Sequence, residues 1–457
     1  MFTGLSVLVG TSAYVFWGHL LWPALWMCYL VFCRSWLQII LTIGAVIYGT
    51  GYLLPQELPT YTTALFSPSS LGPNTTPFGR GLLYKGTLIV EGYVLPCSIA
   101  YQGKNHPPAS QSYRIEGRLK RRGPYDFVFK PKPKTKWEPV EKSWSLAELR
   151  YQTKEKFRKF LSAHLSDRTV ASFLSSLTTG DVEERIFRYE FGRLGLGHLL
   201  AISGFHFGIL IAFCTFGLSL FLPRMWQMAL LFCAINCYFF FVGSSPAVQR
   251  SWLMALLYLL GNVLNRPISG LNLLGCALTI ELLLNPLSAG NLGFQLSFLS
   301  CAGILFFYPI FYRPSMDLLS NFFRGSVSLT FAVNLPLFPL LLYHFHQFPY
   351  LSFLYNLFFP FLVGVALFSL LLAVALSPLL LPLSSLLFSW TNWFTAQLLD
   401  LVSYPPLPLD YSLFVKEFSP LFLPPILFLL LLAKIHLTKE LYCSKILHFC
   451  GGRSSVG

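Results

Sequence analysis

The hydrophobic residues of this chain gather in successive runs, separated by proline, glycine and single basic residues. Each run approaches the roughly 17–25 residues that a helix needs to cross a bilayer. The first 54 residues hold two or three such segments. Later runs lie near 225–242, 248–264, 271–284, 292–311, 326–342, 351–376, 378–402 and 420–435. The pattern predicts a mainly α-helical, polytopic membrane protein.

The apolar run from His198 to Leu222 differs from the others because its first half carries polar and small residues. Polar side chains at membrane depth are costly and normally face a bundle interior or a water-filled path. Glycines four residues apart either admit a neighbouring backbone or let the helix unwind over a cavity. Two interpretations stay open, a packing seam of hydrogen-bonded histidines or a permeation surface. The candidate residues here are His198, Ser203, Gly204, His206 and Gly208.

Further polar residues interrupt the later apolar runs. Arg250 either extends to the lipid headgroups or faces a cavity, where its planar guanidinium would meet a phosphate. The amides and hydroxyls elsewhere either bond between helices or line a path. These remaining candidates for a channel lining are Gln295, Ser297, Asn334 and Asn356.

Residues 55–144 form a polar segment with strand-like alternation. Leu58–Pro77 is rich in proline, serine and threonine, which is typical of a linker. Gly81–Val90 and Ser112–Leu119 alternate apolar and polar residues. Tyr125–Lys130 places an aromatic residue at every second position and therefore on one face. The segment predicts a small extracytoplasmic β-barrel, similar to an OB-fold.

Charge is concentrated in the same region. The chain has a formal net charge of +14, and residues 80–160 hold 18 basic and 7 acidic residues. Such an excess attracts a polyanion, either nucleic acid or anionic lipid headgroups. Aromatic side chains beside a basic rim fit single-stranded nucleic acid, although the same aromatics can simply form the domain core. The candidates for DNA binding are Arg118, Lys120, Arg121, Arg122, Tyr125, Phe127, Phe129, Lys130 and Lys132.

Residues 145–191 predict amphipathic helices that lie along the membrane surface. Ser145 and Glu148 have the spacing of a capping box, which predicts a helix from there to about Ser166. Basic residues four apart form a stripe along it, namely Arg150, Lys154 and Arg158. A shorter helical segment ends near Gly180.

The distribution of arginine predicts an orientation. With the N-terminus inside and three N-terminal crossings, the arginines between the runs of domain 192–437 fall on the inside. The basic tail 438–457 also falls on the inside if the run 378–402 spans the membrane. The first basic residue is Arg34, which argues against a cleavable signal peptide. We expect a multi-pass protein of the inner (cytoplasmic) membrane.

The sequence gives little support for catalysis. It has no phosphate-binding loop for ATP and no C-x-x-C pair, and His198 and His206 have no nearby carboxylate or cysteine. We therefore expect no enzyme activity, no cofactor and no metal site.

The string from His198 to Gly208 resembles the ComEC-type competence family of DNA internalisation channels. The resemblance continues through Leu177–Asp181, Arg250, Asn285-Pro286, Gly293–Phe298, Pro336 and Asn356–Pro360, and the region 113–150 is similar to that family's OB-fold-like domain. It implies that single-stranded DNA crosses the membrane through domain 192–437. Long members end in a metallo-β-lactamase-like domain, and the present sequence has no His-x-His-x-Asp-His string. Any nuclease activity would then come from another protein or be absent.

The leading hypothesis is therefore a DNA internalisation channel subunit that acts in natural transformation. Its partners would be single-stranded DNA, the lipid bilayer, a separate nuclease, a cytoplasmic helicase or an ion gradient that supplies energy, and further copies of the chain in a homo-oligomer. The alternative is a small-molecule or lipid transporter whose basic domain binds anionic headgroups.

Overall fold

The computed structural model describes residues 36–50, 58–76, 79–103, 106–123, 126–132, 137–141, 143–266, 268–349, 352–404 and 412–414, together with a few positions before residue 36. Several predictions lie outside these residues: most of the first two N-terminal segments, Tyr125, the apolar run 420–435 and the tail 438–457. The first helix with continuous description is α3 (Trp36–Thr50).

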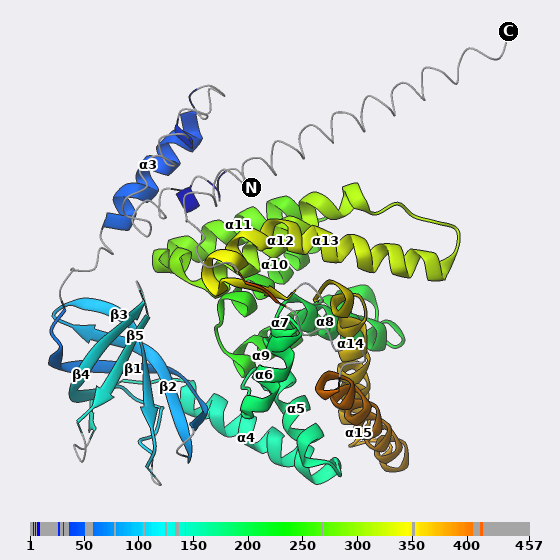
Figure 1. The fold of residues 1–457 in the computed structure, drawn as a ribbon, viewed down its shortest axis with the longest axis horizontal. Coiled ribbons are helices and arrows are strands. Elements are labelled where there is room, and N and C mark those ends of the chain that lie inside the picture. Colours follow the sequence, from blue (N-terminus) through cyan, green and yellow to red (C-terminus); the bar gives the residue numbers. More distant parts are fainter. Residues whose placement is uncertain are drawn as a thin grey trace. The chain divides into compact units, whose positions relative to one another are not determined.

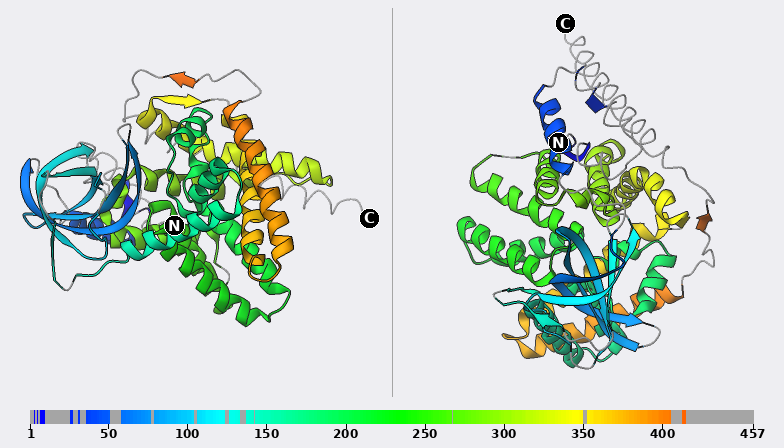
Figure 2. Two further views of the ribbon diagram at one scale, coloured as in Figure 1. Left: turned by 90° about the horizontal axis from the view of Figure 1, so that it is seen from below. Right: turned by 90° about the vertical axis from the view of Figure 1, so that its left-hand side faces the viewer.

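A closed β-barrel follows α3 in the chain. It consists of β1 (Tyr61–Thr76), β2 (Gly79–Val90), β3 (Tyr93–Tyr101), β4 (Tyr113–Gly123) and β5 (Asp126–Pro131), with the short β6 (Glu138–Pro139) beside β4. The strand order is β1-β2-β3-β5-β4-β6, and pairing of β1 with β4 closes the barrel. All pairs are antiparallel except β3 with β5. The curved strands are visible in Figures 1 and 2.

Period-two alternation fills the barrel. On β4 the side chains of Tyr113, Ile115 and Leu119 are buried, whereas Arg114 and Arg118 point outward. Aromatic residues from several strands meet inside and enclose Trp137, whose ring centroid lies 5.2 Å from Tyr84 and 5.4 Å from Tyr113. Burial raises the pKa of the Tyr84 hydroxyl, which donates to the backbone oxygen of Pro107 at 2.6 Å.

The linker prediction for Leu58–Pro77 was wrong, because most of this segment is strand β1. Its two internal prolines are tolerated for a structural reason. β1 pairs with β4 only over Tyr61–Phe66 and with β2 from Leu65 to Thr76. Pro68 and Pro73 lie beyond the pairing with β4, and the register shifts between Pro68 and Ser70. Proline is acceptable at a bulge or where an amide is not needed by the ladder.

Three helices follow the barrel: α4 (Ala147–His164), α5 (Arg168–Thr179) and α6 (Arg185–Arg193). α4 packs against β1 and α5. Asp167 caps α5 through the amides of Thr169 and Val170, and α5 ends at Gly180, whose φ of 78° is in the left-handed region that glycine adopts without strain. The predicted helix 145–166 and the shorter segment after it are therefore present.

The run from His198 to Leu222 forms two helices instead of one. α7 (Gly197–Leu200) ends at an extended segment, and α8 (Gly204–Ser219) begins after Ser203. The Ser203 hydroxyl accepts from the amide of Phe205, and Nδ1 of His206 accepts from the amide of Ser203. These two reciprocal hydrogen bonds hold the start of α8 at Ser203. The break between α7 and α8 therefore coincides with the polar residues of this apolar run.

The remaining helices match the apolar runs closely. They are α9 (Arg224–Val242), α10 (Pro246–Val263), α11 (Gly270–Leu284), α12 (Leu292–Phe311), α13 (Leu318–Phe345), α14 (Ser352–Leu376) and α15 (Leu381–Ser403), with a 3₁₀ turn η1 (Pro286–Gly290) after α11. Four of them, α9, α12, α13 and α14, are long and apolar enough to cross a membrane. The mainly helical class with an inserted barrel is confirmed.

The chain divides into two compact units. Unit 1 comprises residues 1–294 and 361–408, and unit 2 comprises residues 295–360 and 409–457. Unit 2 contains a short antiparallel pair, β7 (Gln347–Pro349) with β8 (Ser412–Phe414). α12 and α13 approach closely within unit 2, because Gly303 leaves space for the backbone oxygen of Ala332.

Candidate functional site

A cationic row crosses three strands on the outer face of the barrel. Arg118 on β4 stands opposite Tyr61 on β1 and opposite Lys130 on β5. Residues that pair across antiparallel strands project from the same face. The Tyr61 side chain is 54% exposed, and both basic side chains are exposed as well. An accessible aromatic ring therefore stands next to two positive charges.

Other predicted basic residues extend this surface. Lys120 is exposed on the same face of β4, two residues beyond Arg118. Arg121 and Arg122 are exposed at the end of β4. Lys132 is partly neutralised, because its Nζ lies 3.7 Å from Oε1 of Glu116. We call Tyr61, Arg118, Lys120 and Lys130 the cationic face.

The structure corrects the prediction for two aromatic residues. Phe127 and Phe129 are 0% and 1% exposed and belong to the barrel core. The guanidinium carbon of Arg121, which pairs with Phe127 across β4 and β5, lies 6.0 Å from the centroid of the Phe127 ring. The alternation of Phe127 and Phe129 correctly placed both rings on one face of β5, and that face is the inner face of the barrel. These rings stabilise the barrel and are not accessible to bases.

Two basic residues of the α4 stripe form buried ion pairs within the protein. Lys154 and Arg158 are buried, and both donate to Oδ2 of Asp181, at 3.0 and 2.9 Å. Arg158 also pairs with Glu183 at 2.7 Å and with Glu155. Burial lowers the pKa of the Lys154 ammonium, and Asp181 opposes this shift. Two of the three stripe residues therefore face carboxylates of their own chain.

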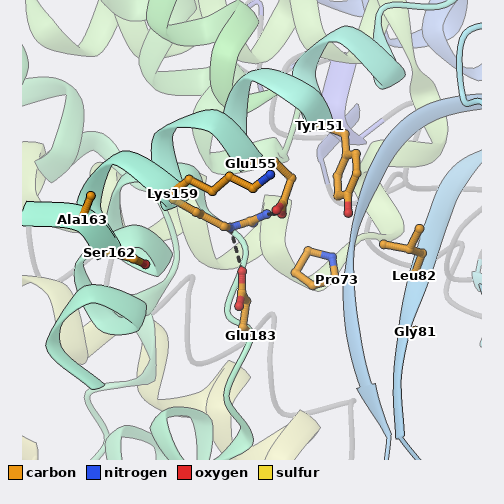
Figure 3. Close-up of a pocket in the computed structure, with 10 residues that line it drawn as sticks. Pro73, Gly81, Leu82, Tyr151, Glu155, Lys159, Ser162, Ala163 and Glu183 are labelled. Atoms are coloured by element: carbon orange, nitrogen blue, oxygen red, sulfur yellow. Dashed lines mark hydrogen bonds and ion pairs between the residues drawn. The ribbon is translucent and has the colours of Figure 1, made fainter. Parts of the chain in front are cut away.

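A groove of about 600 Å³ lies beside this cluster. Figure 3 shows Pro73 and Leu82 of the barrel on one side and Tyr151 and Lys159 of α4 on the other. A dashed line joins Glu183 to the guanidinium that crosses the groove. Because Arg158 is matched here by Glu155, Asp181 and Glu183, the groove offers a polyanion less than the cationic face does.

The barrel is attached to α4 through backbone atoms. The Ser145 hydroxyl donates to the oxygen of Pro68, and the Glu148 carboxylate accepts from the amide of Ala109 at 2.8 Å. The capping box predicted from these two residues does not form, since the residue that caps α4 is Leu146, without a side-chain bond. Arg150 donates to the oxygen of Ser69 at 3.2 Å and to that of Phe240 at 2.7 Å.

The break before α8 faces Arg250 of α10. A Cβ placed on Gly204 would lie 3.3 Å from Nη2 of Arg250 and 3.3 Å from the Ser251 hydroxyl, so glycine permits this close approach. Arg250 is 8% exposed. His206 is buried, and Nε2 of its ring has no hydrogen-bond partner among the described residues. His198 is exposed, and a Cβ on Gly208 would meet nothing within 4 Å.

The other candidates for a channel lining belong to unit 2. Gln295 is half-buried and Ser297 is buried on α12. Asn334 donates to the oxygen of Thr330 at 2.9 Å, within its own helix α13. The amide oxygen of Asn356 is buried on α14 without a hydrogen-bond partner among the described residues. These positions remain predictions for a polar path.

The sequence alone did not single out Tyr61, and it gave Asp181 and Glu281 no role in a site. Tyr61 lay in the supposed linker, although the alternation Tyr61, Thr63, Leu65 signals a strand face. Asp181 was noted as the end of a helical segment and of a stretch that resembles the family. Glu281 on α11 is 3% exposed and accepts no hydrogen bond from the described residues, and a lone carboxylate in an apolar run is itself a signal of function.

The fold and these surfaces define a class: a mainly helical protein with several potential membrane spans that carries a closed β-barrel with a cationic face. The family model described as "Competence protein" matches residues 178–440. The chain therefore belongs to the competence protein family. It is 31% identical over 242 residues to ComE operon protein 3 of Bacillus subtilis (strain 168), a match that covers 50% of this chain and 30% of that protein. No solved structure gives a significant match.

Proposed function

We propose that this chain is a subunit of a channel that passes single-stranded DNA across the cytoplasmic membrane during competence. Membership of the competence protein family supports the role in DNA uptake. The aligned part of ComE operon protein 3 is less than a third of that protein, so activities of the whole relative are not transferred. The single observation that carries the proposal is the row of Tyr61, Arg118 and Lys130 on the barrel surface.

In this proposal the cationic face receives the strand. Arg118, Lys120 and Lys130 neutralise phosphates, and the Tyr61 ring stacks on a base. Electrostatic attraction of this kind is independent of sequence, which suits a protein that takes up DNA of any origin. The barrel stands outside the membrane, and the apolar helices α9, α12, α13 and α14 span it.

The path through the membrane domain begins, in this proposal, at the break between α7 and α8. Irregular backbone at membrane depth is tolerated where it lines a cavity. Arg250 next to Gly204 supplies a phosphate contact there. Energy comes from a partner such as a cytoplasmic helicase or from an ion gradient, and a separate nuclease removes the complementary strand.

The binding test uses the full chain in nanodiscs of zwitterionic lipid. The barrel needs β1, so a fragment beginning at Pro77 would lack a strand that pairs with β2 and β4. We expect the affinity for a fluorescent oligothymidine to fall with salt, at a log–log slope of about −0.7 per neutralised phosphate. Replacing Arg118, Lys120 and Lys130 by alanine should reduce the slope by about 2 units.

The matched control replaces three exposed lysines outside the cationic face by alanine. These are Lys85, Lys156 and Lys159. Since the net charge changes equally, a similar loss in both variants would mean that only total charge matters. Binding to anionic vesicles without salt-dependent DNA binding would favour a lipid or small-molecule transporter. In cells that lack the protein, uptake of labelled DNA should be restored by the wild type and not by Arg250→Ala.

A further inference from the structure

We propose that the connection between α12 and α13 binds the headgroup of an anionic phospholipid through Arg313 and Arg324, and that the apolar residues beside them lie in the same headgroup layer. The inference rests on the part of the proposed function that places α12 and α13 across the bilayer, and it does not depend on DNA. We call residues 312–325 the α12–α13 hairpin and residues 316–319 its tip.

The first observation is the length of α13. It has 28 residues and therefore measures about 42 Å. The hydrocarbon core of a bilayer is about 30 Å thick, and the bilayer with both headgroup layers is about 40–45 Å thick. The part of α13 from Gly325 onward is already long enough to cross the core. The first two turns, Leu318–Arg324, therefore lie at the level of the headgroups.

The second observation is where two arginines lie along this hairpin. A Cβ placed on Gly325 would lie 3.6 Å from the Tyr308 hydroxyl and 3.8 Å from the Tyr312 ring, so α12 and α13 are in contact there. Arg313 follows Tyr312 in the chain, and Arg324 precedes Gly325. The two arginines therefore flank one contact between the helices, at the level where both leave the core.

The third observation is that both guanidinium groups are unused within the protein. Arg313 and Arg324 are exposed, and neither side chain makes a hydrogen bond or an ion pair with another described residue. The acidic residue of the hairpin is Asp317, whose Oδ2 accepts from the amide of Ser320 at 2.8 Å and so caps α13. The hairpin thus offers two arginines to an external anion.

The charge of the membrane complements this pair. The orientation predicted from the sequence places the hairpin on the cytoplasmic side. Anionic lipids give that leaflet a negative surface potential, which attracts basic residues beside a membrane span. A guanidinium is also suited to phosphate, because its planar donors can form two parallel hydrogen bonds.

The tip of the hairpin is apolar and exposed. Met316 is fully exposed, Leu318 is 87% exposed and Leu319 is 64% exposed. The amide of Ser315 donates to Oδ1 of Asn321, and the Asn321 side chain donates to the oxygen of Ser315, both at 2.6 Å. The turn is thereby held in one shape. Apolar side chains beside basic ones at the end of a span are typical of segments that lie in the membrane interface.

A protein partner could also cover an apolar tip, but the neighbouring aromatic residues favour lipid. Tyr308 and Tyr312 stack, with ring centroids 5.2 Å apart and 9° between the ring planes. Tyrosine is enriched at the membrane–water interface, where its ring contacts the acyl chains and its hydroxyl contacts the headgroups. A phosphate held by Arg313 and Arg324 would bring the acyl chains of its lipid beside these rings.

The first test measures lipid binding by the full chain in detergent. Phosphatidylglycerol is titrated against phosphatidylcholine of the same chain length, and native mass spectrometry gives the fraction of protein that carries each lipid. We expect the wild type to bind phosphatidylglycerol in preference. Arg313→Gln together with Arg324→Gln should lower the affinity for phosphatidylglycerol about thirtyfold and leave that for phosphatidylcholine unchanged.

The matched control is Arg224→Gln together with Arg266→Gln. These arginines are exposed next to α9 and α10, and the change in net charge is the same. The control should keep the preference for phosphatidylglycerol. An equal loss in both double variants would show that only total charge attracts the lipid and would overturn a site at the hairpin. Size-exclusion profiles and melting temperatures first establish that each variant is folded.

A second measurement reports on the tip without changing it. Chloramine-T is a water-soluble oxidant that converts exposed methionine to its sulfoxide, and mass spectrometry of peptides follows Met316. In nanodiscs that contain phosphatidylglycerol, Met316 should be protected in the wild type and should react in the Arg313→Gln, Arg324→Gln variant. Rapid oxidation of the wild type in these nanodiscs would place the tip in water and favour a protein partner instead.

The outcomes distinguish this inference from the proposed function. A wild type without preference for phosphatidylglycerol would overturn the lipid site, whereas DNA binding by the cationic face in zwitterionic nanodiscs would be unaffected. Conversely, a preference that requires Arg313 and Arg324 would support the lipid site even in a protein that binds no DNA.

Discussion

Arg150 donates from Nε to the backbone oxygen of Phe240 at 2.7 Å, although 90 residues separate them in the chain. The acceptor lies in the last turn of α9, where carbonyl groups have no partner within the helix. The same guanidinium reaches Ser69 of β1 at 3.2 Å. One side chain thus joins the barrel, α4 and the end of α9.

This relationship predicts a measurable effect of Arg150→Met on stability. The substitution keeps most of the length of the side chain and removes two hydrogen bonds to solvent-exposed backbone oxygens, each of which contributes about 0.5–1.5 kcal/mol. The melting temperature of the full chain in detergent should fall, and the segment between the barrel and α4 should become sensitive to protease. Lys156→Met, at an exposed position of the same helix, serves as control and should change neither. Equal melting of both variants would contradict the role of Arg150.

Asp181→Asn should destabilise the protein more strongly. The substitution removes the shared charge partner of Lys154 and Arg158, which are both buried. Breaking a buried ion pair from one side costs about 3–5 kcal/mol. Chemical denaturation monitored by circular dichroism measures the loss. The exposed pair of Glu116 and Lys132 provides the comparison, and Glu116→Gln should cost no more than about 1 kcal/mol.

The Asp181→Asn variant should also change the pH dependence of stability. Burial already lowers the pKa of Lys154 below its ordinary value of 10.5, and Asp181 raises it again. Without Asp181 the pKa falls further, so the unfolded chain binds more protons than the folded one as the pH approaches 10.5. Stability relative to the wild type should therefore recover as the pH is raised toward that value. A deficit that stays constant over this range would show that Lys154 is not responsible.

Tyr61→Ala should weaken binding of single-stranded DNA without changing its salt dependence. Loss of one stacked base costs about 1–3 kcal/mol, which is at least about a fivefold loss of affinity. Because no charge is removed, the slope against salt should stay the same. Tyr61→Phe keeps the ring and should bind as the wild type does. Tyr93→Ala, at a partly exposed tyrosine of β3, is the control, and an equal loss there would argue against a defined stacking position.

The Cys97 thiol should be unreactive in the folded protein. It is buried in the barrel, and burial raises its pKa to about 12. At pH 8.5 almost no thiolate forms, so labelling by a maleimide should require unfolding of the barrel. Its contribution to stability is complete below the ordinary pKa of 9.0 and is lost as the pH rises through about 12. Mass spectrometry of labelled peptides follows the reaction, and rapid native labelling would mean that the barrel opens.

Gly303→Ala should disturb unit 2. The added Cβ would lie 2.4 Å from the backbone oxygen of Ala332 and 2.7 Å from Cγ of Pro336, so α12 and α13 must separate. Overpacking of this kind costs about 1–3 kcal/mol. Gly217→Ala on α8 is the control, because a Cβ there meets nothing within 4 Å and alanine favours a helix. Melting curves of the two variants should move in opposite directions.

The helical part of the fold follows closely from hydrophobic periodicity. The apolar run 292–311 coincides with α12, and the run 351–376 differs from α14 by one residue. Long apolar segments leave a chain few alternatives to a helix, because every backbone group must be paired without water. The break at Ser203 was left open by the sequence, and the choice was made by the capping contacts of Ser203 and His206.

The barrel surface was harder to predict because alternation does not say which face is buried. Phe127 and Phe129 share a face with one another, and only the closure of β1 onto β4 determines that this face is internal. The composition of β1 is that of a linker, because its prolines lie at and beyond a bulge in the strand. Ser145 and Glu148 have the spacing of a capping box, but tertiary partners on the barrel compete successfully for both side chains.

The contacts of Ser145, Glu148 and Arg150 with the barrel all go to main-chain atoms, namely those of Pro68, Ala109 and Ser69. These three hydrogen bonds do not depend on which side chains the strands display on the outside of the barrel. Substitutions on the outside of the barrel can therefore accumulate without loosening its attachment, and the surface that meets an incoming polymer can evolve separately from the helices behind it.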